Sequence, residues 1–301
     1  MKKVISLVLV AVIVLFSGCR APENKVTPPF FKITDPETGG VVYLLGTMHV
    51  GVKNTVYPDE IYEALDECEA LAVEIDLQAL EADQQRLLNA MKLLECKGET
   101  AEDYLGDDYS DIKKFFRKNG IYGSSLEGYI PSVWSSMLSN KLAGDCGYQS
   151  QYGTDRAMLT YAKKHSIEII ELETVEEQYQ MNADEPRELQ IYSLVSTVQT
   201  EYKKLTEQMK ELYSAWSTND GAAIEKMLSE EDVPEELSEA YAEYYFAMYE
   251  NRQEKMAEFI EKTLENGGKC VVAVGAMHCF ATPDILDFLD GKIIESVGYF
   301  D

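Results

Sequence analysis

Two of the three histidines in this chain end the same short phrase, which occurs once near each end of the sequence. The first phrase runs from Val41 to His49 and the second from Val271 to His278, and each is a mostly aliphatic run followed by glycine, a small residue, methionine and histidine. Imidazole is the commonest metal-binding side chain and a general acid or base near neutral pH. Two such side chains at one place would make a site, whereas either one alone could simply satisfy hydrogen bonds at a strand end.

The run before each histidine predicts where the side chain lies. Neither run alternates between polar and apolar residues, which indicates a strand buried on both faces, as in a parallel sheet. The glycines that follow, Gly46 and Gly275, let the backbone turn sharply. Each histidine then lies just past the carboxyl end of a central strand, the edge where open α/β sheets bind their ligands. We therefore predict that His49 and His278 face one cavity.

Acidic residues are predicted at the same edge. Glu74 lies near the end of the predicted strand Leu71–Ile75. A carboxylate in a buried strand costs several kcal/mol unless it is paired or bound to metal, so Glu74 either belongs to the site or faces water at the strand end. Glu171 and Glu173 follow the predicted strand Ile167–Ile170, and one of them is expected to reach the same edge.

Several other polar side chains could have either a structural or a functional role. Asp155 opens a predicted helix, where an acid complements the helix dipole. Arg252 lies in an acidic helix and by default is an exposed ion-pair partner. A tyrosine stripe at helical spacing favours core packing over a peptide-binding groove; it comprises Tyr241, Tyr245 and Tyr249.

Strand and helix patterns alternate around these residues. The predicted elements are the hairpin strands Phe30–Thr34 and Val41–Leu45, a helix from about Asp59 to Glu69, the strand Leu71–Ile75, a helical stretch to about Cys96, the strands Ile167–Ile170 and Cys270–Val274, a helix near Pro283–Leu289, and a short C-terminal strand. The strand–helix–strand order implies a right-handed parallel connection. The predicted fold class is α/β: a mainly parallel central sheet with helices on both faces. A large helical insertion at about 100–265 is expected to cap its ligand-binding edge.

The N-terminus reads as an export signal. Two lysines precede the apolar stretch Val4–Phe16, which is too short to span a bilayer comfortably. Phe16-Ser17-Gly18-Cys19 resembles a bacterial lipobox and implies removal of residues 1–18 and a lipid on Cys19, with plain secretory cleavage as the alternative. Residues 19–29 are rich in proline and read as a lipidated tether. Residues 30–301 then form the domain, anchored to the cell membrane and facing outside the cytoplasm.

Composition narrows the class of partner. The chain has 301 residues, 46% of them apolar, which is enough for one sizeable core. It carries 53 acidic and 27 basic residues, for a formal charge of −26. Such a surface repels phosphate backbones, so nucleic acid is excluded as a partner, and it favours metal ions and basic peptides. The cysteines form no CxxC pair, so a zinc ribbon is not supported.

Taken in order, these motifs resemble the TraB/PrgY/GumN family, which is related to the animal Tiki proteases. The correspondence consists of two GxxH motifs at Gly46–His49 and Gly275–His278, a strand acid at Glu74, a Gly-x-Asp helix start at Asp155, a Leu-Glu-Thr step at Glu173, and an arginine-bearing helix at Arg252, with Gln253 in place of the usual asparagine. The resemblance implies an α/β fold shared with erythromycin-esterase-like and ChaN-like proteins. For the Tiki branch it also implies metal-dependent peptide hydrolysis.

The expected function is therefore a lipid-anchored, extracytoplasmic, metal-dependent hydrolase that acts as a peptidase on exported peptides. His49 and His278 would bind a divalent metal, and zinc, manganese and cobalt all suit two imidazoles with a carboxylate. Glu74 would be the third ligand or the base that activates water. Arg252 would stabilise an oxyanion or orient an acid, and Asp155 and Glu173 complete the expected catalytic set.

A second interpretation comes from the PrgY-like members, whose role is to block a peptide signal. Together with the tyrosine-rich helical region, they suggest a lipoprotein that binds a peptide, haem or a metal without turnover.

Overall fold

The structure is a computed structural model that describes residues 23–229 and 233–300. The predicted signal peptide, Cys19 and the first part of the predicted tether lie outside these residues. Within the described ranges, no helix is both long enough and apolar enough to cross a membrane.

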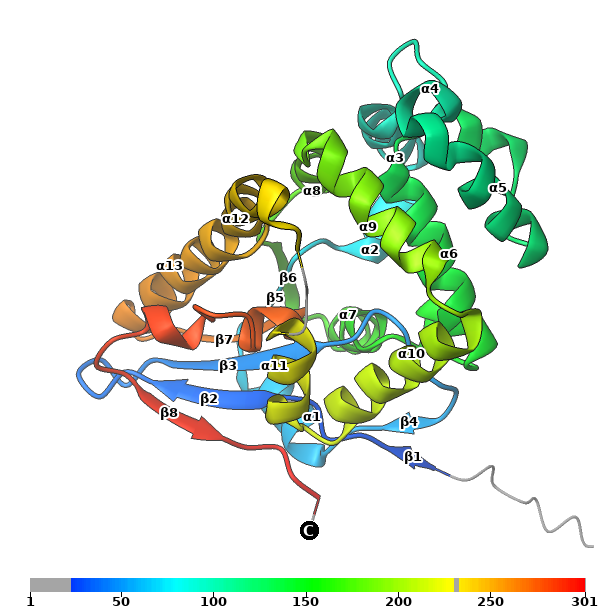
Figure 1. Ribbon diagram of the computed structural model, residues 1–301. Coiled ribbons are helices and arrows are strands. Elements are labelled where there is room, and N and C mark those ends of the chain that lie inside the picture. The colour runs from blue at the N-terminus through cyan, green and yellow to red at the C-terminus, as the bar shows by residue number, and fades with distance from the viewer. Residues whose placement is uncertain (1–22, 230–232, 301) are drawn as a thin grey trace, which may run out of the picture.

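A six-stranded sheet forms the centre of the protein (Figure 1). Its strands, in spatial order, are β6 (Glu168–Glu171), β5 (Ala70–Val73), β7 (Lys269–Gly275), β3 (Val41–Thr47), β2 (Phe30–Thr34) and β8 (Ile293–Ser296). The first four are parallel, and β2 runs antiparallel to both of its neighbours. The prediction of a mainly parallel central sheet in an α/β fold is confirmed.

The central strands β5, β7 and β3 are largely buried on both faces, which explains the unbroken apolar runs. On one face, Val271 and Ala273 of β7 pack with α1 (Asp59–Glu67) and α7 (Thr154–His165). On the other face, the alternate residues of β7 pack with α13 (Asn251–Glu265). Successive side chains of a strand point to opposite faces, so a strand between two helical layers needs apolar residues at every position.

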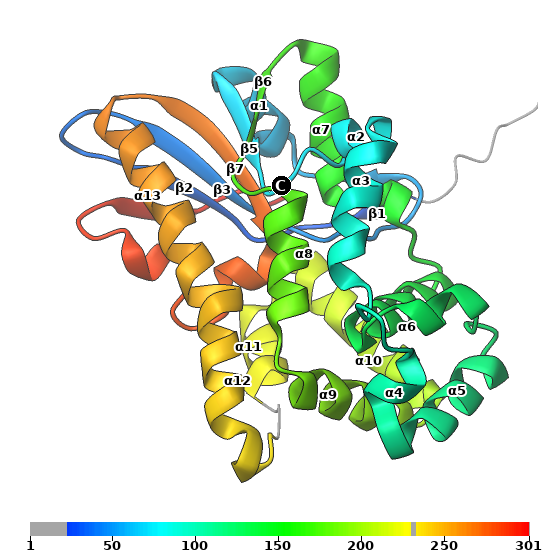
Figure 2. The ribbon, with the colours of Figure 1, turned by 90° about the horizontal axis from the view of Figure 1, so that it is seen from above.

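Most of the remaining helices form a cap beyond the carboxyl ends of the parallel strands (Figures 1 and 2). They are α2 (Leu77–Ala82), α3 (Gln84–Met91), α4 (Ala101–Leu105), α5 (Tyr109–Lys118), α6 (Pro131–Asp145), α8 (Val175–Asp184), α9 (Arg187–Gln199), α10 (Tyr202–Ser217), α11 (Gly221–Ser229) and α12 (Ser238–Tyr245). The cap has its own core around Phe116 and Trp134. Within the predicted insertion, α7, β6 and α13 return to the sheet, so the cap comes from separate stretches of chain.

Two segments differ from the prediction. Residues 23–29, expected to belong to a tether, pack against the domain: β1 (Asn24–Lys25) pairs with β4 (Thr55–Val56), and Val26 is buried. The helix expected near Pro283–Leu289 is only a short 3₁₀ turn, Leu286–Phe288. The chain must turn there toward the edge strand β8, which leaves no room for a longer helix. The five cysteines of the described ranges are all free thiols, four of them buried.

Candidate active site

The two histidine motifs leave the sheet side by side. Strands β3 and β7 are parallel neighbours, and Thr47 is in register with Gly275. His49 follows β3 directly in a loop, and His278 lies in the 3₁₀ turn after β7. A Cβ added to Gly275 would lie 3.2 Å from Glu74 Oε1 and 3.9 Å from His49 Nε2. Gly275 therefore leaves open the space between the glutamate and the first histidine.

The start of α7 is held tightly against the first motif. Thr154 N–H donates to the carbonyl of Met48 at 2.9 Å. A Cβ on Gly153 would lie only 2.5 Å from the His49 carbonyl oxygen, so only glycine permits this approach. The contact brings the first turn of α7, including Asp155, beneath the His49 ring.

Asp155 is the partner of His49. Its Oδ2 lies 2.9 Å from His49 Nδ1, and its Oδ1 accepts a 2.6 Å hydrogen bond from the Thr47 hydroxyl. The negative charge of Asp155 raises the pKa of His49 to about 9. With Nδ1 held in this way, Nε2 is the ring nitrogen left for other partners. The interpretation of Asp155 as an ordinary helix-dipole acid therefore misses its main contact.

Glu74 is held from three directions at the end of β5. The backbone N–H of Gly275 donates to its Oε1 at 2.6 Å, and Gln178 Nε2 and Arg252 Nη2 each donate to its Oε2 at 2.9 Å. Burial alone would raise the pKa of Glu74, but the surrounding positive charge and the Gly275 N–H together hold it below its usual range. Each carboxylate oxygen has two lone pairs, so Oε1 can still accept one more proton or bond.

Arg252 joins Glu74 to Glu173. Its Nε and Nη2 donate to the two Glu173 oxygens, each at 2.6 Å, and its Nη1 contacts the carbonyl oxygen and the sulfur of Met248. With the bond to Glu74, these contacts account for every N–H of the guanidinium. Arg252 is only 8% exposed, so its default interpretation as an exposed ion-pair partner is wrong. Of the two candidate glutamates, Glu173, which follows β6, reaches the site, whereas Glu171, the last residue of β6, accepts the backbone N–H of Asp76.

His278 is buried beside Glu74. Its Nε2 lies 4.0 Å from Glu74 Oε1, and its Nδ1 has no hydrogen-bond partner among the described residues. Burial lowers the pKa of His278 to about 4, which leaves the ring neutral at pH 7. The Tyr249 ring lies 6.2 Å from the imidazole. Tyr249 belongs to the tyrosine stripe, whose members are half-buried, so the stripe is not part of the core that its spacing suggested.

Gln253 fixes the loop that follows His278. Its amide Nε2 donates to the carbonyls of Ala281 at 3.1 Å and Pro283 at 2.7 Å, and its side chain is fully buried. Gln253 thus ties α13 to the second histidine motif while its neighbour Arg252 binds the glutamates.

The side chains gathered at the site are of the types that bind divalent metals. His49 presents Nε2 with Nδ1 on a carboxylate, the arrangement that commonly orients a metal-bound histidine. His278 has an unpartnered buried nitrogen, Glu74 retains a free position on Oε1, and Gly275 leaves the space before them open. As placed, however, no group of three or more His, Cys, Asp or Glu donors within the described ranges could hold a metal ion. The residues therefore match the chemistry of a metal site without forming a closed cage.

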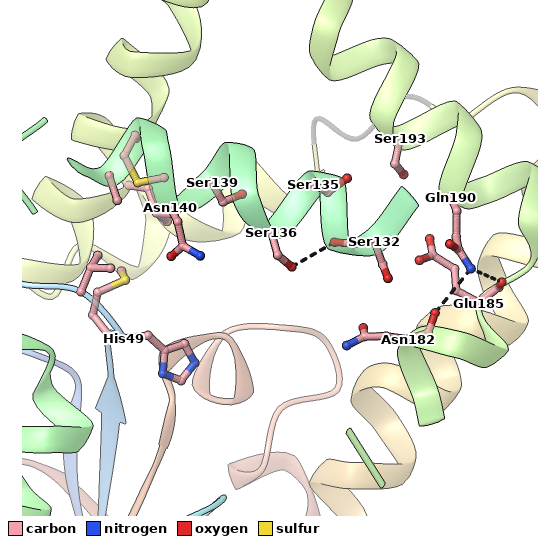
Figure 3. Close-up of a pocket in the computed structure, with 15 residues that line it drawn as sticks. His49, Ser132, Ser135, Ser136, Ser139, Asn140, Asn182, Glu185, Gln190 and Ser193 are labelled. Carbon is pink, nitrogen blue, oxygen red and sulfur yellow. Dashed lines mark hydrogen bonds between the residues drawn. The ribbon is translucent and has the colours of Figure 1, made fainter. Parts of the chain in front are cut away.

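A cavity of about 530 Å³ opens in front of His49 (Figure 3). Serines of α6 form one wall, and residues from α8 and α9 close the far end. The His49 side chain, 66% exposed, lies at the opposite end. The cap thus places a ligand-sized space, lined by both polar and apolar side chains, beside His49, whereas His278 does not line it.

Sequence reasoning missed Gln178 and Thr47. Thr174 and Glu177 form a capping box, which marks a helix start directly after Glu173. A side chain one turn into that helix, Gln178, then comes back beside Glu173, and this signal was available in the sequence. Thr47 lies inside the first GxxH motif, but nothing local indicates its bond to Asp155.

A model of the TraB/PrgY/gumN family matches residues 29–292. No curated protein and no solved structure matches the chain significantly.

Proposed function

This chain belongs to the TraB/PrgY/gumN family, as its motifs predicted, and from that membership and its site we propose that it is a metal-dependent hydrolase that cleaves peptides. The observation that carries the proposal is Glu74, a buried carboxylate held beside two histidines with one oxygen still able to accept a proton. The cavity in front of His49 offers room for an extended substrate.

His49 and His278 are the residues that would hold the metal, with Glu74 beside them to act on the water. When bound, a divalent metal supplies Lewis-acid chemistry that polarises a carbonyl and makes water more acidic. Asp155 orients His49 through Nδ1. His278, neutral at pH 7, needs to lose no proton before it binds. His49, whose pKa Asp155 raises to about 9, has to give up its Nε2 proton first.

Glu74 is the proposed general base, because its Oε1 can take a proton from water while Oε2 stays bound to Arg252 and Gln178. Arg252 is a positioning residue: its N–H groups are all used on Glu74, Glu173 and Met248, so it orients the acid rather than binding an oxyanion. Glu173 in turn fixes the guanidinium.

Hydrolysis of a peptide library by the purified protein tests the proposal. The protein is loaded in turn with zinc, manganese or cobalt, and cleavage products are identified by mass spectrometry. We expect cleavage with at least one metal and none after EDTA treatment. If no metal supports cleavage, the hydrolase proposal fails.

The alternative is a protein that holds a peptide without turnover. It is favoured by the lack, within the described residues, of three donors already placed for a metal. In that case the library would yield bound peptides and no products.

Gly275→Ala is expected to reduce turnover by up to about tenfold, because a misplacement near 1 Å costs about a hundredfold and the carboxylate here must move by only a few tenths of an ångström. The new methyl group would lie 3.2 Å from Glu74 Oε1 and would push the carboxylate from its place. Gly144→Ala is the control, because a Cβ there meets nothing within 4 Å. Initial rates and circular dichroism of both variants are the measurements. Unchanged rates in Gly275→Ala would show that this space is not used.

The proposed location is the outer face of the cytoplasmic membrane, with a lipid on Cys19. Buried methylenes contribute about 0.8 kcal/mol each, and stable attachment needs more than one chain. Cys19→Ala is expected to release the protein from membranes or leave it uncleaved, as seen by cell fractionation. A mature protein that begins elsewhere and carries no lipid by mass spectrometry would contradict this.

A further inference from the structure

The end of the cavity far from His49 contains a buried amide oxygen that has nothing to bind. Gln190 is 2% exposed, and its Oε1 has no hydrogen-bond partner among the described residues. Its Nε2 donates to the carbonyls of Glu185 at 2.8 Å and Asn182 at 3.4 Å. Because these two carbonyls fix which end of the amide is nitrogen, Oε1 is the free atom. A buried acceptor left without a donor is costly.

Two further acceptors lie at the same end. Ser132 Oγ on α6 is buried and has no partner in the described part of the chain. The Glu185 carboxylate, between α8 and α9, takes part in no hydrogen bond or ion pair among those residues, and burial raises its pKa to about 7. Figure 3 shows Glu185 and Gln190 gathered at the end of the cavity opposite His49, with Ser132 nearby. The described lining contains neither lysine nor arginine.

We propose that this end of the cavity binds the protonated primary amine of a peptide. An ammonium group has three N–H donors and no acceptor, which matches the acceptors of Gln190, Ser132 and Glu185. A hydrogen bond between two charged groups is about twice as strong as one between neutral groups.

This inference deepens the proposed function and rests on it for the identity of the ligand as a peptide. A peptide anchored by its amine would run along the serines of α6 toward His49. The substrate class is then a peptide that carries a free amine near the bond that is cut. The amine could be the amino terminus or a lysine side chain, and the experiment separates these sources.

Isothermal titration calorimetry on the full-length protein in detergent, with metals removed by EDTA, measures binding without turnover. The probes are tetraalanine amide, its N-acetylated form, and N-acetyl-Ala-Ala-Ala-Lys amide. We expect at least one amine-bearing probe to bind about tenfold or more tightly than the acetylated tetraalanine amide. Preference for the first probe assigns the amino terminus, and preference for the third assigns lysine. Equal binding of all three, or no binding, overturns the inference.

Glu185→Gln keeps the size of the side chain but removes its charge. We expect it to weaken binding of the preferred amine probe about tenfold and to leave the acetylated tetraalanine amide unaffected. Glu188→Gln is the matched control, since Glu188 is exposed and does not line the cavity. Ser132→Ala, a smaller change, should weaken the same probe severalfold. Equal effects of Glu185→Gln and Glu188→Gln would overturn the inference.

The two proposals fail separately. If no peptide is cleaved under any metal but the preference for an amine persists, the hydrolase proposal falls and the amine site stands. If peptides are cleaved but free and acetylated forms bind alike, the amine site falls and the hydrolase proposal stands.

Discussion

Arg252→Met is expected to lower the free energy of unfolding by about 3–5 kcal/mol, the usual cost of breaking a buried ion pair from one side. The guanidinium is the cation paired with both Glu74 and Glu173, whose side chains are only 14% and 11% exposed. Methionine fills much of the same volume but leaves both carboxylates largely buried, with only the neutral donors of Gln178 and the Gly275 backbone. Urea denaturation followed by circular dichroism gives the change.

Arg86→Met is the matched control for this prediction. Arg86 also bridges two glutamates, Glu171 and Glu176, but its side chain is 29% exposed and the glutamates are more exposed still. Surface ion pairs contribute about 0–1 kcal/mol, so Arg86→Met should change stability little. Similar losses in the two variants would show that the Arg252 cluster is no more stabilising than a surface pair.

Glu74→Gln is expected to lower turnover at least about a hundredfold, in line with the contribution of a general base. An amide cannot accept a proton from water as a carboxylate does. It also places an NH₂ group against either the Gly275 N–H or the Arg252 Nη2, both of which are donors. Rates are therefore compared at a temperature where circular dichroism shows the variant to be folded.

Glu168→Gln serves as the control for Glu74→Gln. Glu168 is exposed at the opposite end of the same sheet. Glu168→Gln therefore makes the same change of charge far from the site. Turnover of that variant should match the parent protein. Full turnover in Glu74→Gln would leave the fold assignment intact but remove the proposed mechanism.

The sheet could be predicted from sequence because its signals are local. The apolar runs of β3 and β7 each carry their own turn signal, and parallel strands deliver their carboxyl ends to one edge. His49, His278 and Glu74 therefore could be assigned to that edge before the structure was known. The capping box at Thr174 and Glu177 likewise marks a helix start from sequence alone.

The partners of these residues could not be predicted, because they come from distant parts of the chain. The helix around Arg252 is rich in acids, so its local pattern suggests a solvated face. Burial of Arg252 depends on Glu74 and Glu173, which arrive from two other strands. Asp155 looks like an ordinary first-turn acid until the close approach at Gly153 places it under His49.

The cavity, too, could not be predicted from the sequence. Serines recur along α6 at helical spacing, and a polar stripe of that kind is readable in the sequence. Which surface the stripe faces depends on how the helices of the cap pack on one another, and α6 contacts both α9 and α10. The unpartnered acceptors of Gln190 and Ser132 appear only once these helices are in place.

We propose above all that the two GxxH histidines, one from each motif, form a single divalent metal site. Metal content after equilibrium dialysis against zinc, manganese or cobalt, measured by mass spectrometry, tests it most directly. We predict about one ion per chain in the parent protein and in His165→Ala, whose imidazole is exposed and stacks on Tyr161. His49→Ala and His278→Ala should each lose the ion while keeping their secondary structure. A parent protein that retains no metal, or binding that survives in both variants, would contradict the account.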